Sequence, residues 1–227
     1  MEIKREQLGK YSVFTVAGGY AFGADSLLLA RFSTLKERER VADICAGNGV
    51  VGYTAAETQA PQVLDFYELN PTACDLLEMA ARENGLNGVV YQGDIIKTSV
   101  ARAGQYDCVL CNPPYYKATK TPLPQGEAER KQYYRDAAKT ECAVTLEEVI
   151  ASANRLLAGD GRLCMCVRME RLGEACALLE GKKMPVKRLQ LVRAKKGDAP
   201  YLALIESKKG AKSGLTALPV LTIGEDL

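Results

Sequence analysis

The stretch Arg40-Val-Ala-Asp-Ile-Cys-Ala-Gly-Asn-Gly-Val-Val-Gly52 decides the fold, because an apolar run passes into a glycine-rich loop and then into a helical run. Residues 40–45 are expected to form a buried strand, and residues 49–59 the helix after it. The glycines at 47, 49 and 52 have the spacing G-x-G-x-x-G, which lets a backbone approach a ligand at a helix N-terminus. Such a unit is typical of a parallel α/β sheet.

The alternation of short β-rich runs with helical segments continues through most of the chain. Further strands are expected at 62–67, 89–92, 106–111 and 162–167, and a final antiparallel hairpin at 186–192 and 201–206. Helices are expected at 25–32, from Asn70-Pro71 onward, at 146–157 and at 171–180. This order predicts a mostly parallel sheet with helices between its strands.

The length of 227 residues, of which 47% are hydrophobic, suits a single packed domain. We divide it into an N-terminal lid or helix segment (1–38), a core (39–210) and a C-terminal tail (211–227). The polar segment 115–139 holds few residues of the kind that fill a core. It is therefore expected to be a loop or a partly ordered lid.

The composition excludes several kinds of chemistry, because the chain contains no histidine. A Ser-His or Cys-His catalytic pair, a histidine general base and a histidine-containing metal site are all ruled out. Cys108 and Cys111 have the spacing of metal ligands, but the residues between them favour a strand rather than the turn that a zinc site needs. We therefore expect no metal.

The cysteines and the N-terminus indicate a compartment. Several of the eight cysteines lie in apolar runs, where cysteine behaves as a small hydrophobic residue. The first residues lack the apolar region of a signal peptide, and no apolar run is long enough to span a membrane. We predict a cytoplasmic protein with free thiols and no membrane contact.

Three acids stand at the ends of successive predicted strands. Asp43 lies beside the glycine loop, where the pyrophosphate of a dinucleotide would be repelled, whereas the cationic S-adenosylmethionine would be attracted. Glu68 is placed to accept hydrogen bonds from a ribose. Asp94 is placed to accept from an adenine amino group, while Ile95 packs on the ring. Together the acids favour S-adenosylmethionine over a nicotinamide dinucleotide.

The tetrapeptide Asn112-Pro113-Pro114-Tyr115 follows the strand predicted at 106–111 and faces the ligand crevice. The Asn112 side-chain oxygen and the Pro113 carbonyl can accept the two N–H groups of a planar amine. They would draw its nitrogen toward tetrahedral geometry and aim its lone pair at an activated methyl group. Tyr115 offers a flat surface for stacking, and the two prolines keep the backbone stiff.

These motifs resemble those of the class I N6-adenine methyltransferases that carry Asn-Pro-Pro-Tyr. More narrowly, the chain resembles the bacterial tRNA1(Val) (adenine-37-N6)-methyltransferase family. The resemblance rests on residues 19–30, 43–52, 68–71, 93–94, 112–116, 205–210 and 218–221. It implies a Rossmann-like class I methyltransferase fold, with a seven-stranded, mostly parallel sheet and an antiparallel C-terminal hairpin.

The resemblance also implies a set of functional residues, with Tyr20, Phe22 and Asp25 closing over the methionine end of the donor. The catalytic residues are expected to be Asn112, Pro113, Pro114 and Tyr115. The residues expected to bind the cofactor S-adenosylmethionine are Tyr20, Phe22, Asp25, Asp43, Gly47, Asn48, Gly49, Glu68, Leu69, Asp94, Ile95 and Asn112. Two positions depart from the family pattern: Cys45 replaces a glycine of the donor loop, and Lys139 stands where relatives often have a histidine.

Charge is distributed unevenly, and this favours an RNA substrate. Residues 182–212 contain ten Lys and Arg against two acids, while the whole chain carries only +2. A basic face suits a polyanion, and adenine 37 of tRNA lies in a single-stranded loop, where a base can be splayed out. The residues expected to bind RNA are Tyr115, Tyr116, Lys117, Lys120, Arg130, Lys131, Arg135, Lys195 and Lys196.

The predicted function is methyl transfer to the N6 amino group of an adenine in tRNA, by a monomer or weak homodimer. An adenine in ribosomal RNA remains an alternative. So does the amide of a glutamine in a release factor, which is also planar with two hydrogens. The glutamine enzymes resemble this chain only after a longer N-terminal helical domain, and the basic segment also favours RNA. A nicotinamide oxidoreductase and an RNA-binding module without activity are further alternatives, which binding of S-adenosylmethionine would test.

Overall fold

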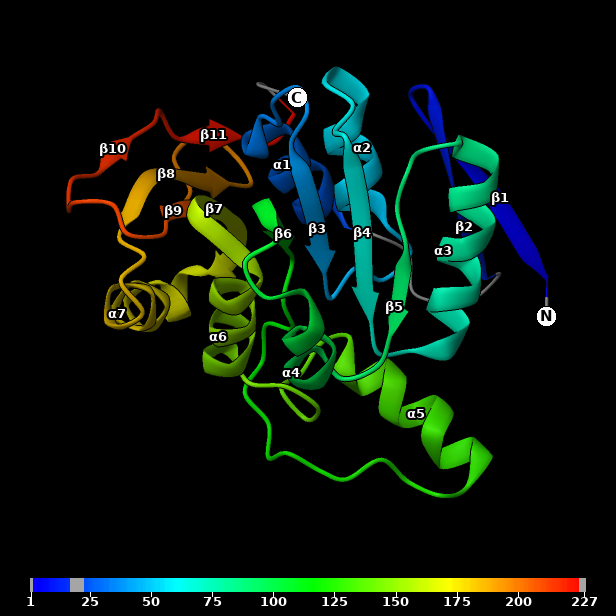
Figure 1. The fold of residues 1–227 in the computed structure, drawn as a ribbon. Coiled ribbons are helices and arrows are strands. Elements are labelled where there is room, and N and C mark those ends of the chain that lie inside the picture. Colours follow the sequence, from blue (N-terminus) through cyan, green and yellow to red (C-terminus); the bar gives the residue numbers. More distant parts are fainter. Residues whose placement is uncertain (1, 17–22, 225–227) are drawn as a thin grey trace.

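The computed structural model describes residues 2–16 and 23–224. Its large sheet contains β3 (Arg40–Ile44), β4 (Val63–Glu68), β5 (Val90–Gln92), β6 (Tyr106–Cys111), β7 (Leu157–Arg168), β8 (Val186–Arg193), β9 (Leu202–Lys208), β10 (Thr216–Ala217) and β11 (Leu221–Thr222). The order across the sheet is β10-β8-β9-β7-β6-β3-β4-β5, with β11 also paired to β8 (Figure 1).

The five strands from β3 to β7 run parallel, while β9 is antiparallel to both β7 and β8. This confirms the predicted Rossmann-like sheet with its antiparallel C-terminal hairpin. The two-residue strands β10 and β11 pair in parallel with β8 and widen the sheet beyond the seven strands expected. Parts of the predicted tail, residues 216–217 and 221–222, thus belong to the sheet.

Helices lie on both faces of the sheet, and one further helix projects away from it. They are α1 (Ala24–Ser33), α2 (Val50–Thr58), α3 (Pro71–Asn84), α4 (Ile95–Thr98), α5 (Glu127–Ala137), α6 (Leu146–Leu156) and α7 (Leu172–Gly181). Buried residues of α1, α2 and α3 form one core cluster against the sheet, and those of α6 and α7 form a second. Thr145 caps α6, and Glu148 completes the predicted capping box.

Alternation along the strands explains how one sheet serves two cores. In β6, Cys108 and Leu110 belong to the first cluster, whereas Val109 and Cys111 belong to the second. Successive side chains of a strand point to opposite faces. A central strand that is covered on both faces must therefore be apolar throughout, and this is why the short apolar runs could be recognised in the sequence.

The N-terminal segment contains the predicted helix as α1 and, before it, a hairpin that was not predicted. Before α1, β1 (Ile3–Leu8) and β2 (Tyr11–Val16) form an antiparallel hairpin with Leu8 opposite Tyr11. β2 is buried against α2 and α3, but β1 is mostly exposed and carries Lys, Arg, Glu and Gln. The polar β1 has no strong strand signal, so its role as a cover for β2 was not predictable from its composition.

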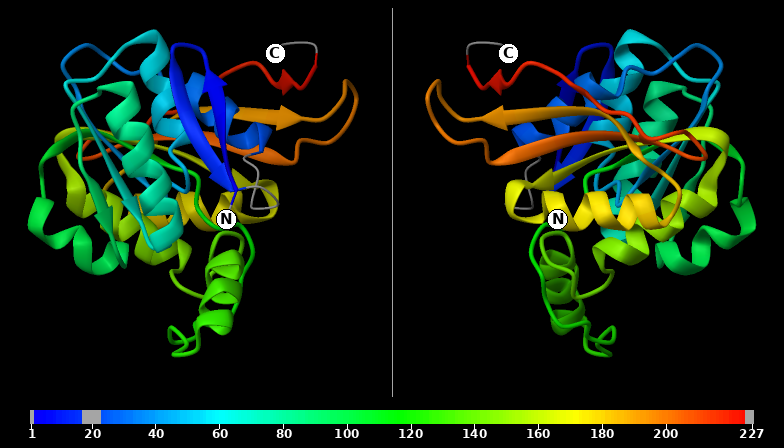
Figure 2. Two further views of the ribbon diagram at one scale, coloured as in Figure 1. Left: turned by 90° about the vertical axis from the view of Figure 1, so that its right-hand side faces the viewer. Right: turned by 90° about the vertical axis from the view of Figure 1, so that its left-hand side faces the viewer.

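The segment predicted as a loop, 115–139, contains the helix α5. None of its residues is buried, so it lacks the apolar stripe by which amphipathic helices are recognised. Figures 1 and 2 show α5 projecting away from the sheet. The two ends of the segment that carries α5 are paired with each other. Tyr116 forms a β-bridge with Thr140. The Tyr116 N–H donates to the Lys139 carbonyl (3.0 Å), and the Glu141 N–H donates to the Tyr116 carbonyl (2.9 Å).

A smaller difference concerns residues 159–161, which were predicted as a turn. They lie within β7, where the register jumps from Tyr106 opposite Leu157 to Cys108 opposite Arg162. The extra residues form a bulge, in which Asp160 has φ +63°.

Two further findings concern the cysteines and the helices. All eight cysteines are free thiols. Among residues 2–16 and 23–224, no helix is both long and apolar enough to cross a membrane.

Candidate functional site

The predicted site residues gather at the carboxyl edge of the parallel strands. Asp43 belongs to β3, Glu68 ends β4, and Asp94 follows β5 by two residues. Asn112 follows β6 directly. Ligands of open α/β sheets bind in the crevice outside this edge, so the topology brings together residues far apart in the sequence.

The glycine loop between β3 and α2 needs glycine at two positions for different reasons. Gly49 caps α2 with φ +81°, and a Cβ there would lie 2.7 Å from a methyl carbon of Leu77. At Gly52 a Cβ would lie 2.9 Å from the Phe66 ring. The loop is therefore packed closely against α3 and β4, which leaves its other side for a ligand.

Asp43 lies beneath this loop and is fully buried, with 0% of its surface exposed. Its Oδ2 accepts the Gly52 N–H (2.9 Å), whereas its Oδ1 is buried with no hydrogen-bond partner among the described residues. Burial holds the pKa of Asp43 well above its ordinary value, and the nearby charge of Glu68 raises it further. None of the described residues supplies the donor that this buried oxygen requires.

Glu68 and Asp94 also hold the backbone in place. Glu68 accepts the N–H groups of Asn70 and Gly47 on separate oxygens, each at 2.8 Å, and burial raises its pKa despite these bonds. The Oδ1 of Asp94 caps α4 by accepting the Ile96 N–H (2.9 Å). A carboxylate offers about four lone-pair positions, so each of these acids retains acceptor capacity for a ligand.

The other predicted donor-binding residues show different degrees of exposure. Ile95 is only 6% exposed and packs in the second core cluster, and Leu69 is partly exposed. The Asn48 side chain donates to the Phe14 carbonyl of β2 (3.4 Å) and so ties the loop to the N-terminal hairpin. Tyr20 and Phe22 lie outside the described residues.

The Asn112 side chain is held from both sides. Its Nδ2 donates to the Ser26 hydroxyl at the start of α1 (3.0 Å), and its Oδ1 accepts the Cys166 thiol from β7 (3.1 Å). Pro113 and Pro114 after it are buried. The amide oxygen thus has a fixed direction on a stiff segment, while its second lone pair is available to another donor.

Two tyrosine hydroxyls share the carboxylate of Asp25. Tyr115 donates to Oδ2 and Tyr201 to Oδ1, each at 3.1 Å. Burial raises the pKa of Tyr115 far above its ordinary value, and the charges of Cys166 and Asp25 act in the same direction. Burial likewise raises the pKa of Tyr201. Both hydroxyls therefore remain protonated donors at neutral pH, and Asp25 links α1 to the Asn112–Tyr115 motif.

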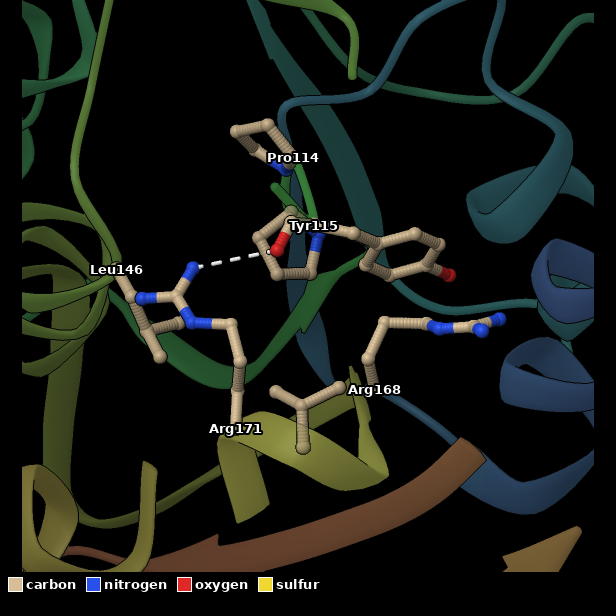
Figure 3. Close-up of a pocket in the computed structure, with 7 residues that line it drawn as sticks. Pro114, Tyr115, Leu146, Arg168 and Arg171 are labelled. Atoms are coloured by element: carbon tan, nitrogen blue, oxygen red, sulfur yellow. Dashed lines mark hydrogen bonds between the residues drawn. The ribbon is translucent and has the colours of Figure 1, made fainter. Parts of the chain in front are cut away.

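A small pocket opens beside this motif. Its walls are Pro113, Pro114, Tyr115, Leu146, Val167, Arg168 and Arg171 (Figure 3). Arg171 is anchored by Glu141 and Glu174, each at 2.8 Å, and its Nη1 donates to the Tyr115 carbonyl (3.5 Å). Arg171 thus connects Glu141, at the end of the segment that carries α5, to the Asn112–Tyr115 motif.

Residues 12–126 match the family model of the methyltransferase small domain. The chain belongs to this family. A methyltransferase that uses S-adenosylmethionine was predicted from the sequence, and this class of enzyme is confirmed.

Named relatives agree with this membership. The tRNA1(Val) (adenine(37)-N6)-methyltransferase of Serratia proteamaculans is 31% identical over 67% of this chain and 56% of its own length. The enzyme of the same name from Tolumonas auensis is 28% identical over 81% of this chain and 74% of its own length. The matches thus span between about half and three quarters of these relatives.

Solved structures show the same fold at low identity. A predicted O-methyltransferase from Agrobacterium tumefaciens covers 88% of this chain and 89% of its own, with a TM-score of 0.64 and 19% identity. TYW2 of M. jannaschii, solved with AdoMet, covers 91% of this chain and 85% of its own, with a TM-score of 0.58 and 13% identity. These structures confirm the class I methyltransferase fold.

The residues of this methyltransferase fit S-adenosylmethionine. The Oδ1 of Asp43 has no hydrogen-bond partner among the described residues, and burial raises the pKa of both Asp43 and Glu68. A cationic ligand would favour the ionised forms of these two acids, so the pair suits such a ligand. A Cβ at Gly47 would meet nothing within 4 Å, so the outer side of the loop is open. The donor set thus has the charge and the space that this cofactor needs.

The residues predicted to bind RNA fall into two groups. Three of the four in the first group pair with acids: Lys117 with Glu174 (3.0 Å), Lys120 with Glu148 (2.8 Å) and Lys131 with Glu127 (2.8 Å). The fourth, Arg130, donates to the Gln125 carbonyl (2.7 Å). Tyr116, Arg135, Lys195 and Lys196 are exposed. The last two lie in the turn between β8 and β9, which the strand register puts beyond the same sheet edge as Asn112.

The basic segment 182–212 owes part of its charge to structural contacts. Arg188 pairs with Glu206 (2.7 Å) and lies over the Phe32 ring. Lys209 donates to the carbonyls of Asn154 (2.7 Å) and Leu157 (2.8 Å). These side chains hold β8, β9 and α6 together, so the surplus of positive charge in the sequence overstates the free basic surface.

Sequence reasoning missed the residues that hold the motif in place. Ser26 and Cys166 fix the Asn112 amide, and Tyr201 shares Asp25 with Tyr115. Ser26 follows Asp25 in a block that was singled out, so its place next to the donor was a usable signal. Cys166 and Tyr201 carried no such signal, because their contacts depend on the registers of β6, β7 and β9.

Proposed function

We propose that this chain transfers a methyl group from S-adenosylmethionine to the exocyclic N6 amino group of an adenine in tRNA, at position 37 beside the anticodon. The observation that carries the proposal is the Asn112 amide, whose Oδ1 is held at the end of β6 by the bonds to Ser26 and Cys166. The names of the curated relatives support the adenine and the tRNA.

When bound, S-adenosylmethionine supplies a methyl group that its sulfonium already activates. Asn112 Oδ1 and the Pro113 carbonyl then accept the two N–H hydrogens of the adenine amino group. Because these acceptors withdraw the hydrogens from the ring plane, the nitrogen lone pair is freed from the ring and directed across the crevice. The two prolines keep both acceptors in place, so little reorganisation is needed.

Proton transfer needs no dedicated base. The amino nitrogen becomes acidic once it carries the extra methyl group, and its proton passes to water. The chain has no histidine to take it, and neither the Asn112 amide nor a backbone carbonyl is a base. The lack of histidine is therefore compatible with this reaction, whereas it excludes hydrolytic chemistry of the Ser-His type.

The adenine is expected to stack on Tyr115, whose hydroxyl is tied to Asp25. This bond limits rotation of the side chain and so fixes the plane of the ring. A base must leave its stack to reach such a site, which costs least in a single-stranded loop. An anticodon loop in a cytoplasmic tRNA meets this requirement.

A labelled-methyl assay tests the proposal. Unmodified total tRNA, ribosomal RNA and a release factor are incubated separately with the enzyme and labelled S-adenosylmethionine, and the modified nucleoside or residue is identified. Label in N6-methyladenosine at position 37 of a tRNA is expected. Label only in ribosomal RNA or in a glutamine would overturn the assignment of the substrate, while no label in any of them would overturn the activity.

A further inference from the structure

Arg168 lies next to the Asn112–Tyr115 motif although it is far from it in the sequence. It ends β7, the parallel neighbour of β6, and Cys111 of β6 lies opposite Met165. Three residues further on, Arg168 reaches the sheet edge beyond which the motif lies. Arg168 and Tyr115 line the same pocket. In Figure 3 the Arg168 guanidinium points to the same side as the Tyr115 ring, while that of Arg171 points to the other side.

The two arginines of the pocket differ in how their charge is balanced. Arg171 is 8% exposed and is paired with two carboxylates at 2.8 Å. Among the described residues, Arg168 reaches only Glu170, with its Nε 3.9 Å from a carboxylate that is 74% exposed. An exposed pair at this distance contributes little. The positive charge of Arg168 is therefore almost uncompensated within the described part of the chain.

Contacts with neighbouring groups orient the Arg168 guanidinium but leave it short of hydrogen bonds. Its Cζ lies 5.2 Å from the centroid of the Tyr201 ring, which supports it by a cation–π contact. Tyr201 is itself fixed by Asp25. The Arg168 Nε is buried and has no hydrogen-bond partner in residues 2–16 and 23–224. A buried donor of this kind requires an acceptor, and the described residues supply none although Arg168 lines the pocket.

We propose that Arg168 forms an anion subsite that binds a phosphate of the RNA strand next to the methylated adenine. The inference rests on the proposed function. The acids expected to bind the donor lie in or just after β3, β4 and β5, on one side of Asn112, whereas Arg168 ends β7 on the other side. An adenine stacked on Tyr115 brings its own phosphates into the reach of this pocket, and a planar guanidinium can bind a phosphate through two N–H groups.

The test compares Arg168→Gln with Arg82→Gln, which removes an exposed arginine on α3. Binding of an anticodon stem-loop is measured over a series of salt concentrations, with calorimetry of S-adenosylmethionine in parallel. Arg168→Gln should raise the Kd for RNA about tenfold and lower the slope of log K against log salt by about one, as expected for one lost phosphate contact. The Kd for S-adenosylmethionine should not change, and Arg82→Gln should behave as the wild type.

A second variant protects the test against misfolding. Arg168→Lys keeps the charge, so it should retain the salt slope while it loses part of the affinity. Circular dichroism checks the fold of each variant. An unchanged RNA affinity and slope in folded Arg168→Gln would overturn the subsite. A rise in the Kd for S-adenosylmethionine would also overturn it, because the anion bound would then be the carboxylate of the donor.

Modified RNA locates the phosphate. Stem-loops in which one phosphate beside the target adenine is replaced by a neutral methylphosphonate are compared in wild type and Arg168→Gln. One replacement should weaken binding to the wild type about tenfold and have no further effect on the variant. If, at every phosphate tested, the methylphosphonate weakens binding to the variant as much as binding to the wild type, the contact with Arg168 is overturned. If the wild type methylates no RNA at all, the proposed function fails. If it methylates RNA, but the effects of the methylphosphonate and of Arg168→Gln are independent, only the subsite fails.

Discussion

At the scale of single residues, the Asn112 amide is the group on which the proposed chemistry depends. Asn112→Ala removes one of two acceptors for the substrate amino group but none of the acids Asp43, Glu68 and Asp94. Turnover should fall at least about a thousandfold, comparable with the largest losses for a missing preorganised hydrogen bond, while the Kd for S-adenosylmethionine stays within about twofold.

Single-turnover methyl transfer and calorimetry measure these two quantities. Asn87→Ala is the matched control, because Asn87 is exposed and its side chain donates to the Gln62 carbonyl before β4, far from Asn112 in the order of strands. Near-normal turnover of Asn112→Ala would contradict the mechanism.

Asp43 should make the binding of S-adenosylmethionine depend on pH. Burial raises the pKa of this carboxyl group in the free protein, whereas a cationic ligand favours its ionised form. The affinity should therefore increase as the pH rises through the raised pKa, with release of a proton on binding. Over the same range the ligand-free protein should lose stability, since a raised carboxyl pKa contributes stability that is present below its ordinary value and lost above the folded one.

Calorimetry in buffers of different ionisation enthalpy measures the released proton. Burial also raises the pKa of Glu68, so Asp43→Asn serves to separate the two groups: it should bind more weakly and lose most of the pH dependence. If the wild type and Asp43→Asn show the same pH dependence of S-adenosylmethionine binding, a group other than Asp43 causes it.

Much of the site was predictable at this scale, but its internal bonds were not. The three acids and the Asn-Pro-Pro-Tyr motif have recognisable residue types at the ends of apolar runs. Cys45, which the resemblance marked as a replacement for glycine, has φ +54°, so the loop adopts a left-handed conformation at a residue other than glycine. The contact between Cys166 and Asn112 could not be predicted from the residue types, because it arises only when β7 pairs with β6.

Among the elements, α5 contains no buried residue, while the ends of the segment that carries it are paired with each other. Replacing residues 122–138 by a short Gly-Ser link should change the free energy of unfolding by less than about 0.5 kcal/mol, because none of the residues of α5 is buried. The bridge between Tyr116 and Thr140 lies outside the replaced residues and keeps the ends together.

Urea unfolding tests this expectation, and the KM for tRNA is measured with the same variant. The KM should rise if α5 contacts RNA, while the Kd for S-adenosylmethionine remains as in the wild type. A loss of more than about 2 kcal/mol would show that the segment supports the core.

The elements that were predicted well are those with a periodic apolar pattern. The parallel strands and α6 with its capping box belong to this group. The hairpin of β1 and β2 and the helix α5 do not, since β1 and α5 place mostly polar side chains in water. Where burial does not constrain a sequence, its pattern carries little information about its structure.

Over the whole molecule, the carboxyl edge of the sheet faces the proposed RNA. Lys195 and Lys196 lie in the exposed turn between β8 and β9 beyond this edge, and Figure 2 shows that this hairpin and α5 project in different directions. Reversing both charges, Lys195→Glu with Lys196→Glu, should weaken RNA binding at least about tenfold and flatten its dependence on salt.

Filter binding of tRNA over a salt series measures the effect. Lys4→Glu with Lys10→Glu is the control, because it makes the same change of charge in the N-terminal hairpin, where both residues are exposed. Equal salt slopes for the two double variants would show that only the net charge matters, and not the turn.

The distribution of charge illustrates what the sequence leaves open at this scale. Counting residues identified 182–212 as basic, but only the folded chain shows that Arg188 and Lys209 are used within the protein. A sequence does not distinguish basic side chains that bind other residues of the protein from those that are free to bind RNA. They differ only in the neighbours that the fold provides.

The short strands β10 and β11 have a consequence for how copies of this molecule meet. A strand at the edge of a sheet presents unpaired N–H and C=O groups, onto which the edge of another copy can add. Here β10 and β11 cover β8 on one side of the sheet, and on the other side β5 is only three residues long. Addition of another copy to the large sheet therefore has little backbone to start from, and in the N-terminal hairpin the exposed strand β1 carries Lys, Arg and Glu, which disfavour such pairing.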